Sequence, residues 1–314
     1  MKRFKNILMY AGTEKTDAAV SRAVTLAIEN GARLTFMDVV KRVPRAISVL
    51  SHATSPEEIE RLLQQDHREK LLKLSSEYVD TGVPIDIRVE IGDPATEIVR
   101  QVVQGKHDLV VKCADGSTSI GRLFGTIARS LLRNCPCPLW ILKPEIHAGF
   151  DRVLAAVDVE SSDQAHCELN RSIVDLGASI AIRENAQLHI VTAWDLWMES
   201  ALRWRSGDLE TDTLIEQHEQ HVHKQLYELM QSSEIPIPES QLHIYRGHPA
   251  RVVRSVTDRL EADLLVMGTV CRTGAAGFLI GNTAETVLDH VNCSILALKP
   301  YGFLSPMEIA IDSR

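Results

Sequence analysis

Short apolar runs alternate with longer segments of mixed polar and apolar residues along the whole chain. The short runs are typical of buried strands, whereas the longer segments place leucines at helical spacing, as at Leu62, Leu63 and Leu71. Long helices are predicted at 56–81 and 208–233, and further helices begin at Pro94 and Pro249. The predicted strands are 6–10, 33–39, 85–91, 109–111 and 139–142, and then 152–157, 187–192, 241–245, 264–267 and 295–298.

The two series of predicted strands belong to an internal repeat. The ending Cys137-Pro-Leu-Trp-Ile-Leu-Lys-Pro144 returns as Cys293-Ser-Ile-Leu-Ala-Leu-Lys-Pro300. Farther upstream, the Gly-x-Pro-Ala segment that starts at Gly92 returns at Gly247. Self-similarity of this extent indicates a duplicated domain. We therefore predict two domains, 1–148 and 149–314.

Each copy reads as strands alternating with helices and closing on a strand. This order favours a parallel sheet that is covered by helices on both faces and has right-handed crossovers. The predicted fold class is α/β, with two tandem five-stranded parallel doubly wound domains of the Rossmann-like type. In such sheets, ligands bind outside the carboxyl ends of the strands, where the strand order reverses. The loops after strands one and four are therefore the expected place for a site.

Composition narrows the possible functions. The 314 residues are 45% hydrophobic and 24% charged, with a formal net charge of −8. No run approaches the roughly 18 apolar residues of a membrane-spanning helix, so we predict a cytoplasmic protein without membrane insertion. An acidic chain that has no basic cluster interleaved with aromatic residues is a poor candidate for direct nucleic acid binding.

Polar and glycine residues follow the predicted strands of the second copy at the expected place. Strand one ends at Val157 and Asp158, and strand four ends at Gly268. Glycines at a strand end let backbone N–H groups approach a phosphate, and a carboxylate accepts hydrogen bonds from a ligand. The alternative is that these glycines only form turns. The remaining candidate ligand-binding residues are Arg272, Gly281, Asn282 and Thr283.

These residues carry a resemblance. Each copy resembles a domain of the universal stress protein family, and the chain is similar to its tandem two-domain type. The ATP-binding members have Gly-x2-Gly-x9-Gly-(Ser/Thr) after strand four and an Asp at the end of strand one. The second copy offers Gly268-x2-Cys271-x9-Gly281-Asn282 together with Asp158. It keeps the outer glycines and the Asp, and it departs at Cys271 and Asn282.

The first copy departs further from that pattern. Cys113 stands where the first glycine belongs, Gly12 replaces the Asp, and only Gly125-Thr126 matches the end of the motif. We therefore expect nucleotide affinity mainly in the second domain and a scaffold role for the first. Single-domain relatives typically dimerise, so the resemblance also implies an intramolecular pseudo-dimer that pairs residues 139–142 with 295–298.

The resemblance implies a non-catalytic stress-response protein that supports survival under stress, including exposure to DNA-damaging agents, without contacting DNA. No cofactor is required, and ATP or another small molecule is the expected ligand. Three alternatives stay open. They are a binder of an apolar or lipid-like molecule, a weak nucleotide hydrolase or phosphotransfer protein, and a module that binds only an unknown protein partner.

Two further segments invite interpretation. Trp194, Trp197 and Met198 follow strand two of the second copy, where they either close the core or line an apolar pocket for a lipid-like ligand. The histidines of 218–223 are spaced by three and then two, unlike the spacing of four in zinc proteases. We interpret 218–223 as a solvated helix face, and we predict no metal site.

Overall fold

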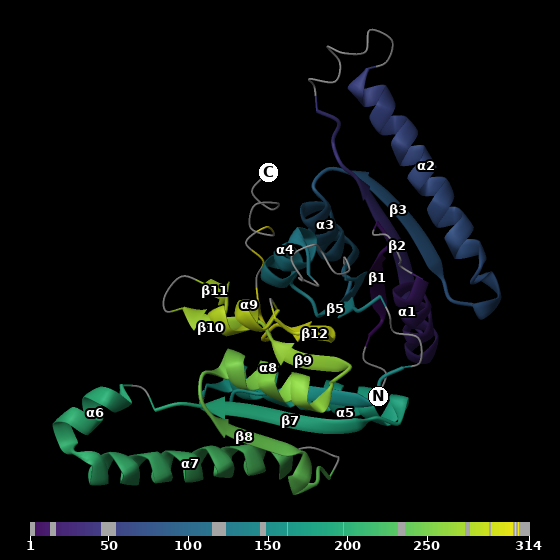
Figure 1. The fold of residues 1–314 in the computed structure, drawn as a ribbon. Helices are drawn as coiled ribbons and strands as arrows, with labels where there is room; N and C mark the ends of the chain where they lie inside the picture. Colours follow the sequence, from purple (N-terminus) through teal and green to yellow (C-terminus); the bar gives the residue numbers. More distant parts are fainter. Residues whose placement is uncertain are drawn as a thin grey trace. The chain divides into compact units, whose positions relative to one another are not determined.

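The computed structural model describes residues 4–12, 17–44, 55–114, 124–144, 149–161, 163–196, 198–231, 236–273, 277–288, 290–303, 305 and 307, without the side chains of 270–273, 277–280, 282, 283 and 288. The chain divides into two compact units (Figure 1). The first unit consists of residues 1–147 and 303–314, and the second consists of 148–302.

The first unit is built on a parallel sheet. Its strand order is β3-β2-β1-β4-β5, so the order in which successive strands are added reverses between β1 and β4. All the pairings within this sheet are parallel. The strands are β1 (Asn6–Tyr10), β2 (Arg33–Val40), β3 (Ile85–Ile91), β4 (Leu109–Cys113) and β5 (Leu139–Leu142). The helices are α1 (Asp17–Asn30), α2 (Pro56–Ser76), α3 (Pro94–Gly105) and α4 (Thr126–Asn134), with a short 3-10 helix at Val79–Thr81.

The second unit repeats this plan. Its order is β8-β7-β6-β9-β12, again entirely parallel, with the reversal between β6 and β9. The strands are β6 (Arg152–Ala156), β7 (Gln187–Trp194), β8 (Leu242–Arg246), β9 (Leu264–Gly268) and β12 (Ser294–Leu298). The helices are α5 (Gln164–Glu184), α6 (Glu199–Ser206), α7 (Asp208–Gln231), α8 (Pro249–Leu260) and α9 (Asn282–Leu288), with a 3-10 helix at Glu239–Gln241. The predicted α/β fold with two tandem parallel sheets is confirmed.

Local sequence explains where several helices begin and end. The Ser55 hydroxyl accepts a hydrogen bond from the Glu58 amide, and the Asp93 carboxylate accepts one from the Thr96 amide. Each cap satisfies a backbone N–H that has no partner within its helix, and a proline follows directly in both cases. Helix α5 ends at its carboxyl end because Asn185 takes a left-handed conformation there.

A carboxylate at the start of strand four holds the start of strand one in both units. Asp108 accepts hydrogen bonds from the amides of Lys5 (2.6 Å) and Asn6 (3.0 Å). Asp263 accepts them from Asp151 (2.8 Å) and Arg152 (2.9 Å). We name these two contacts the aspartate clamps. They join the amino edges of the two strands between which the order reverses.

The structure differs from the sequence prediction in two helical segments. The predicted helix 56–81 ends at Ser76 and is followed by a 3-10 turn that Gly82 closes in a left-handed conformation, with a φ of 71°. Helix α6 was not predicted. Gly207, with a φ of 85°, separates it from α7.

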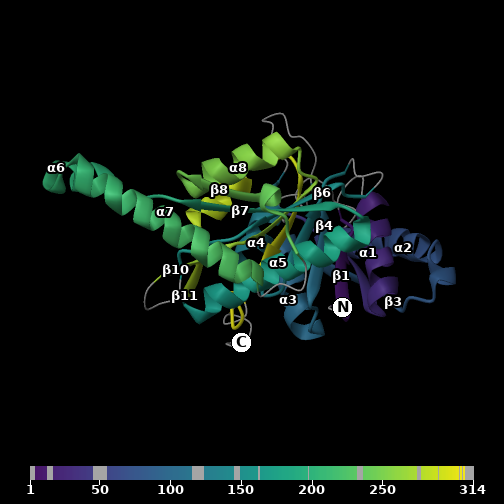
Figure 2. The same ribbon diagram turned by 90° about the horizontal axis from the view of Figure 1, so that it is seen from below.

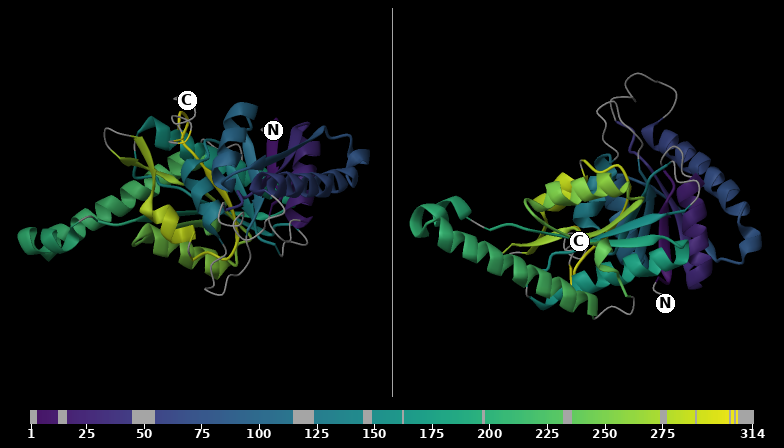
Figure 3. Two further views of the ribbon diagram at one scale, coloured as in Figure 1. Left: turned by 90° about the horizontal axis from the view of Figure 1, so that it is seen from above. Right: turned by 60° about the horizontal axis from the view of Figure 1, so that its bottom comes forward.

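Helices α6 and α7 form an arm on the second unit. Figure 2 shows α7 running along the sheet and beyond it, with α6 at its outer end. The outer end of the arm, in green, projects beyond the strands in both views of Figure 3, whereas Val222 and Leu226 in the inner part of α7 are buried. None of the helices in the described part of the chain is long and apolar enough to cross a membrane.

Candidate functional site

The loop after β6 presents Asp158 at the carboxyl edge of the second sheet. Val157 is buried and donates its amide hydrogen to the carbonyl oxygen of Val191 (3.0 Å), whereas Asp158 is exposed. Asn170 on α5 fixes the backbone of Asp158 from both sides. Its Oδ1 accepts from the Asp158 amide (3.1 Å), and its Nδ2 donates to the Asp158 carbonyl (2.6 Å). The carboxylate is therefore held in one place at the edge of the sheet.

The Asp158 carboxylate also shapes its own loop. One oxygen accepts a hydrogen bond from the Glu160 amide (3.1 Å), and the other accepts one from the Ser161 hydroxyl (3.4 Å). Each carboxylate oxygen has two lone pairs, so acceptor capacity is left for a ligand. The charge of Asp158 thus stands at the surface in a fixed orientation.

Gly268 lies beside this loop. Ala156 pairs with Met267 in the parallel register of β6 and β9, so the residues that follow them lie at neighbouring strand ends. A Cβ atom at Gly268 would be 2.8 Å from Cδ2 of Leu169 on α5. Close packing of α5 therefore requires a glycine here, independently of any phosphate.

The segment expected to cradle a phosphate forms a hairpin. Strands β10 (Val270–Thr273) and β11 (Gly277–Ile280) pair in antiparallel register, with Cys271 opposite Leu279 and Arg272 opposite Phe278. Gly281 then donates its amide hydrogen to the Thr269 carbonyl (3.1 Å), which closes the base of the hairpin. The sequence analysis expected a glycine-rich loop and missed these two strands.

Three of the predicted ligand-binding residues are placed only by their backbone. Arg272 lies in β10, and Asn282 and Thr283 begin α9, but their side chains lie outside the described part of the structure. Gly281 is buried directly before α9. The structure thus brings the ends of β6 and β9 together, while the side-chain roles of Arg272, Asn282 and Thr283 stay a prediction.

The structure does not bring Trp194 and Met198 of the expected apolar pocket into one environment. Trp194 is buried, with its ring 5.3 Å from that of His218 and 5.7 Å from the guanidinium of Arg246. Met198 is 53% exposed and precedes α6. Trp197 lies outside the described residues.

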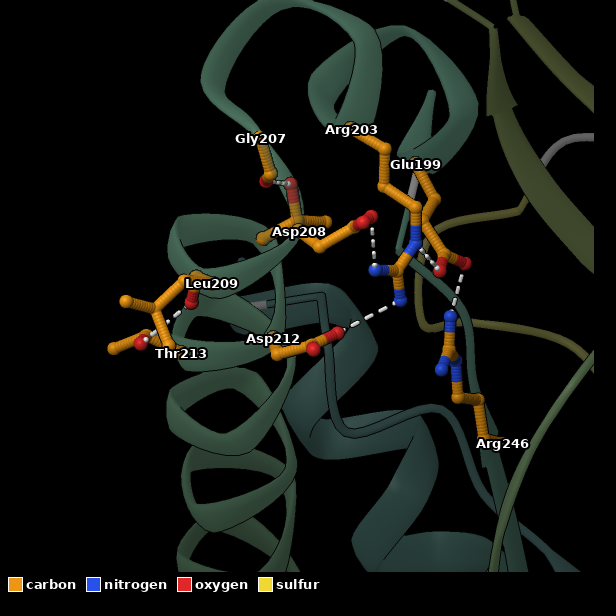
Figure 4. A network of polar contacts seen from close by, with 9 residues as sticks. Glu199, Arg203, Gly207, Asp208, Leu209, Asp212, Thr213 and Arg246 are labelled. Atoms are coloured by element: carbon orange, nitrogen blue, oxygen red, sulfur yellow. Dashed lines mark hydrogen bonds and ion pairs between the residues drawn. The ribbon is translucent and has the colours of Figure 1, made fainter.

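A charged network that the sequence analysis missed holds α6 in place (Figure 4). The Arg203 guanidinium donates to Glu199 (2.9 Å), Asp208 (3.1 Å) and Asp212 (2.8 Å), and these carboxylates raise its pKa above the ordinary range for arginine. Glu199 also pairs with Arg246 at the end of β8. The spacing of Glu199 and Arg203 is a sequence signal for one of these pairs, but the link to Arg246 needs the folded sheet.

Two other polar contacts near Asp158 were also missed. His166 and Asp163 form a pair at the start of α5, with Nδ1 of the imidazole 2.5 Å from the carboxylate. The His218 imidazole lies 2.6 Å from the Glu160 carboxylate, so one histidine of the predicted solvated face connects α7 to the β6 loop. The three-residue spacing of Asp163 and His166 at a helix start was the available signal.

A surface pocket of about 310 Å³ lies beside helix α5. Leu169, which packs against Gly268, is part of its wall, and the cationic side chains of Arg171 and Lys299 face it. The rest of the lining is Glu168, Ser172 and Tyr301. Lys299 belongs to the repeated Lys-Pro ending, for which the sequence analysis had proposed no ligand role.

The described cysteines form no disulfide. The sulfur atoms of Cys135 and Cys137 are 3.6 Å apart, well beyond the disulfide bond length of about 2.05 Å. The hydrogen bond with the Cys135 thiol raises the pKa of Cys137, and burial raises it further. Among the described residues, no three histidine, cysteine or carboxylate side chains come together as a metal-binding group.

Comparison with known proteins gives the same family for both halves. The model of the universal stress protein family matches residues 3–143 and 149–299. Universal stress protein E of Photorhabdus laumondii is 30% identical over 322 residues, which cover 99% of each chain. Universal stress protein E of Escherichia coli K12 is 31% identical over 238 residues, which cover 74% of this chain and 73% of that protein.

Solved structures show the same fold. A functionally unknown protein from Pseudomonas aeruginosa has a TM-score of 0.76 and 24% identity over 100% of this chain and 99% of its own. A universal stress protein from Archaeoglobus fulgidus has a TM-score of 0.62 and 15% identity over 94% of this chain and 98% of its own. With two matches of the family model and relatives that are similar over nearly the full length, the chain belongs to the universal stress protein family.

Proposed function

We propose that this chain is a non-catalytic stress-response protein that binds an anionic, nucleotide-type ligand at the carboxyl edge of its second sheet. Membership of the universal stress protein family supports the stress-response role. The ligand proposal rests on one observation, the fixed and exposed Asp158 loop beside the end of β9 at the reversal of strand order. Open α/β sheets bind their ligands at this position.

The pocket on α5 supports an anionic ligand. Arg171 and Lys299 supply positive charge, while Leu169 and Tyr301 supply apolar surface. Ligand pockets generally combine apolar walls with a few polar groups. A phosphate or carboxylate group fits this combination better than an uncharged lipid tail.

Calorimetric titration with ATP and ADP at millimolar concentration tests the proposal. We expect binding to the parent chain and weaker binding to Asp158→Asn, which keeps an acceptor oxygen for the Glu160 amide but loses the charge. Asp151→Asn is the matched control, because Asp151 is exposed at the opposite end of the same strand. No heat of binding from either nucleotide, or equal affinities for both variants, would contradict the proposal.

A weak nucleotide hydrolase is the second candidate, and the Asp163–His166 pair favours it. His166 lies one turn before Asn170, which binds the backbone of Asp158, so the two side chains share a helix face. A histidine oriented by a carboxylate is a typical general base. Single-turnover ATP hydrolysis by the parent and by His166→Gln separates the candidates, because background rates in both favour a binding protein.

We further propose that the stress role includes survival of DNA-damaging agents without contact with DNA. The net charge of −8 supports the second part. A deletion strain complemented with the parent or with Asp158→Asn, and scored for survival after ultraviolet exposure, tests the role. Equal survival of the deletion and complemented strains would contradict it.

The pairing of residues 139–142 with 295–298 in a pseudo-dimer stays a prediction.

A further inference from the structure

Two histidines from neighbouring strands meet in the second domain, away from the proposed ligand site. Nδ1 of His189 on β7 lies 3.1 Å from Nε2 of His243 on β8. The ring planes differ by 24°, and the ring centroids are 5.2 Å apart. Val191 pairs with His243 in the parallel register, so both imidazoles stand on the same face of the sheet.

Both rings are neutral at pH 7. Burial lowers the pKa of His189, and the positive charge of Arg152 on β6 lowers it further. Burial also lowers the pKa of His243, to about 4, with contributions from His189 and from Arg259 on α8. Neutral imidazole is the form that binds metal ions. Protons therefore compete little for these nitrogens at neutral pH.

We propose that His189 and His243 form a binding site for a divalent transition-metal ion, with water completing the coordination. Two nitrogens on one ion, each at about 2.0–2.1 Å, are roughly 2.9–3.4 Å apart for bond angles of 90–110°. The observed 3.1 Å lies inside this range. When the ion binds, the ring that donates the hydrogen bond between the two imidazoles shifts to its other neutral tautomer, so its proton moves to its second nitrogen. The rings then tilt toward the ion, and the strands do not have to move apart.

The ligand type selects the metal. Imidazole nitrogen suits copper, zinc and nickel, and affinity generally rises toward Cu²⁺. Calcium and magnesium prefer oxygen ligands, and the same face of β8 offers only the Tyr245 phenol, which already accepts a hydrogen bond from Arg259 (2.8 Å). We therefore expect Cu²⁺ to bind more tightly than Zn²⁺.

The surroundings set the strength of the site. Nε2 of His189 is buried and has no hydrogen-bond partner among the described residues, so nothing holds its proton when Nδ1 binds the ion. Loss of such outer support typically costs about 10–100-fold in affinity. Arg152 and Arg259 add positive charge nearby. We therefore expect the ion to bind much more weakly than in a structural zinc site.

Titration of the full-length chain with CuCl₂ at pH 7, followed by calorimetry, tests the site. We expect the parent to bind one Cu²⁺ that His243→Gln loses or binds at least tenfold more weakly. His221→Gln is the matched control, because His221 is exposed on α7, and it should bind as the parent does. Equal stoichiometry and affinity in the parent and His243→Gln would overturn the proposal.

A second measurement needs no variant and so does not depend on variant folding. Pulsed electron paramagnetic resonance of the parent with one equivalent of Cu²⁺ counts the imidazole nitrogens bound to the ion. Two equivalent imidazoles are expected. A spectrum with one imidazole or none would show that copper binds elsewhere and would overturn the site.

Discussion

The two domains differ at the carboxyl end of strand one. In the repeat, Gly12 corresponds to Asp158. The shared strand register likewise makes Asp38 equivalent to Thr192. The acid thus stands after strand one in the second domain and on strand two in the first. Duplicated domains can keep one fold while the carboxylate at a shared corner changes its strand.

The consequence is that one corner is filled and the other is open. A Cβ atom at Gly12 would lie 2.1 Å from Oδ1 of Asp38 and 2.5 Å from the Tyr10 hydroxyl. The Asp38 carboxylate is buried and lies 2.6 Å from Nδ1 of His67. In the second domain, Asp158 is exposed instead. Side chains of the first domain occupy the space that we propose a ligand shares in the second.

The largest effect is expected from Gly12→Asp, which gives the first domain the acid of the second. Although Gly12 is exposed, the new side chain overlaps the buried Asp38 and Tyr10 and places two carboxylates together. We therefore expect the free energy of unfolding to fall by roughly 2–4 kcal/mol. Urea unfolding measures it. The double variant Gly12→Asp/Asp38→Thr copies the second domain and should recover stability. A double variant no more stable than the single one would show that Asp38 is not the obstacle.

A smaller effect is expected from Gly268→Ala. The added methyl group meets Leu169 at 2.8 Å, and overpacking of a buried contact costs about 1–3 kcal/mol. The loss should appear in thermal unfolding without any ligand. In a Leu169→Ala background the same change should cost much less, which a double-mutant cycle measures. Unchanged ligand-free stability would indicate that the glycine serves ligand approach alone.

The smallest effect is an acid sensitivity that His243 gives to the second domain, where the first domain has Arg88 instead. The pKa of His243 is about 4 in the folded chain against an ordinary 6.5. The unfolded chain therefore takes up the proton first, and stability falls as the pH drops from 6.5 toward 4. We expect roughly 1 kcal/mol, less than the full shift implies, because His243 is half-exposed and solvent screens the charges.

Urea midpoints at pH 7, 6 and 5 measure this loss. His243→Gln should flatten the pH dependence of the second domain and leave that of the first unchanged. An identical slope in the parent and the variant would assign the acid sensitivity to other groups.

Much of the fold could be predicted from the sequence, because buried parallel strands are short apolar runs that need no partner to be recognised. Asn6–Tyr10 and Leu139–Leu142 are such strands, and both have the predicted bounds. The β10–β11 hairpin was missed because each strand has only four residues and glycines at 268, 274, 277 and 281 surround them, which is typical of a loop. Composition cannot show that Gly281 pairs with Thr269 across the hairpin.

The site was harder to predict because its contacts join distant segments. Asp158 was identified from its place at a strand end, but its backbone partner Asn170 lies on the next helix. Asp38 and His67 are 29 positions apart, and their contact depends on how α2 covers β2 and β3. Gly268 could be read as a phosphate neighbour or as a packing glycine until Leu169 was seen beside it.

The aspartate clamps have a consequence for how the chain is made. Lys5 precedes its partner Asp108 by 103 positions in the chain, and Arg152 precedes its partner Asp263 by 111 positions. On the ribosome, strand one of each domain therefore emerges long before the residue that fastens it. Each clamp can form only after the fourth strand of its domain has been synthesised, so the clamp of the first domain can form while the second domain is still being translated. The two aspartate clamps therefore form one after the other during the synthesis of a single chain.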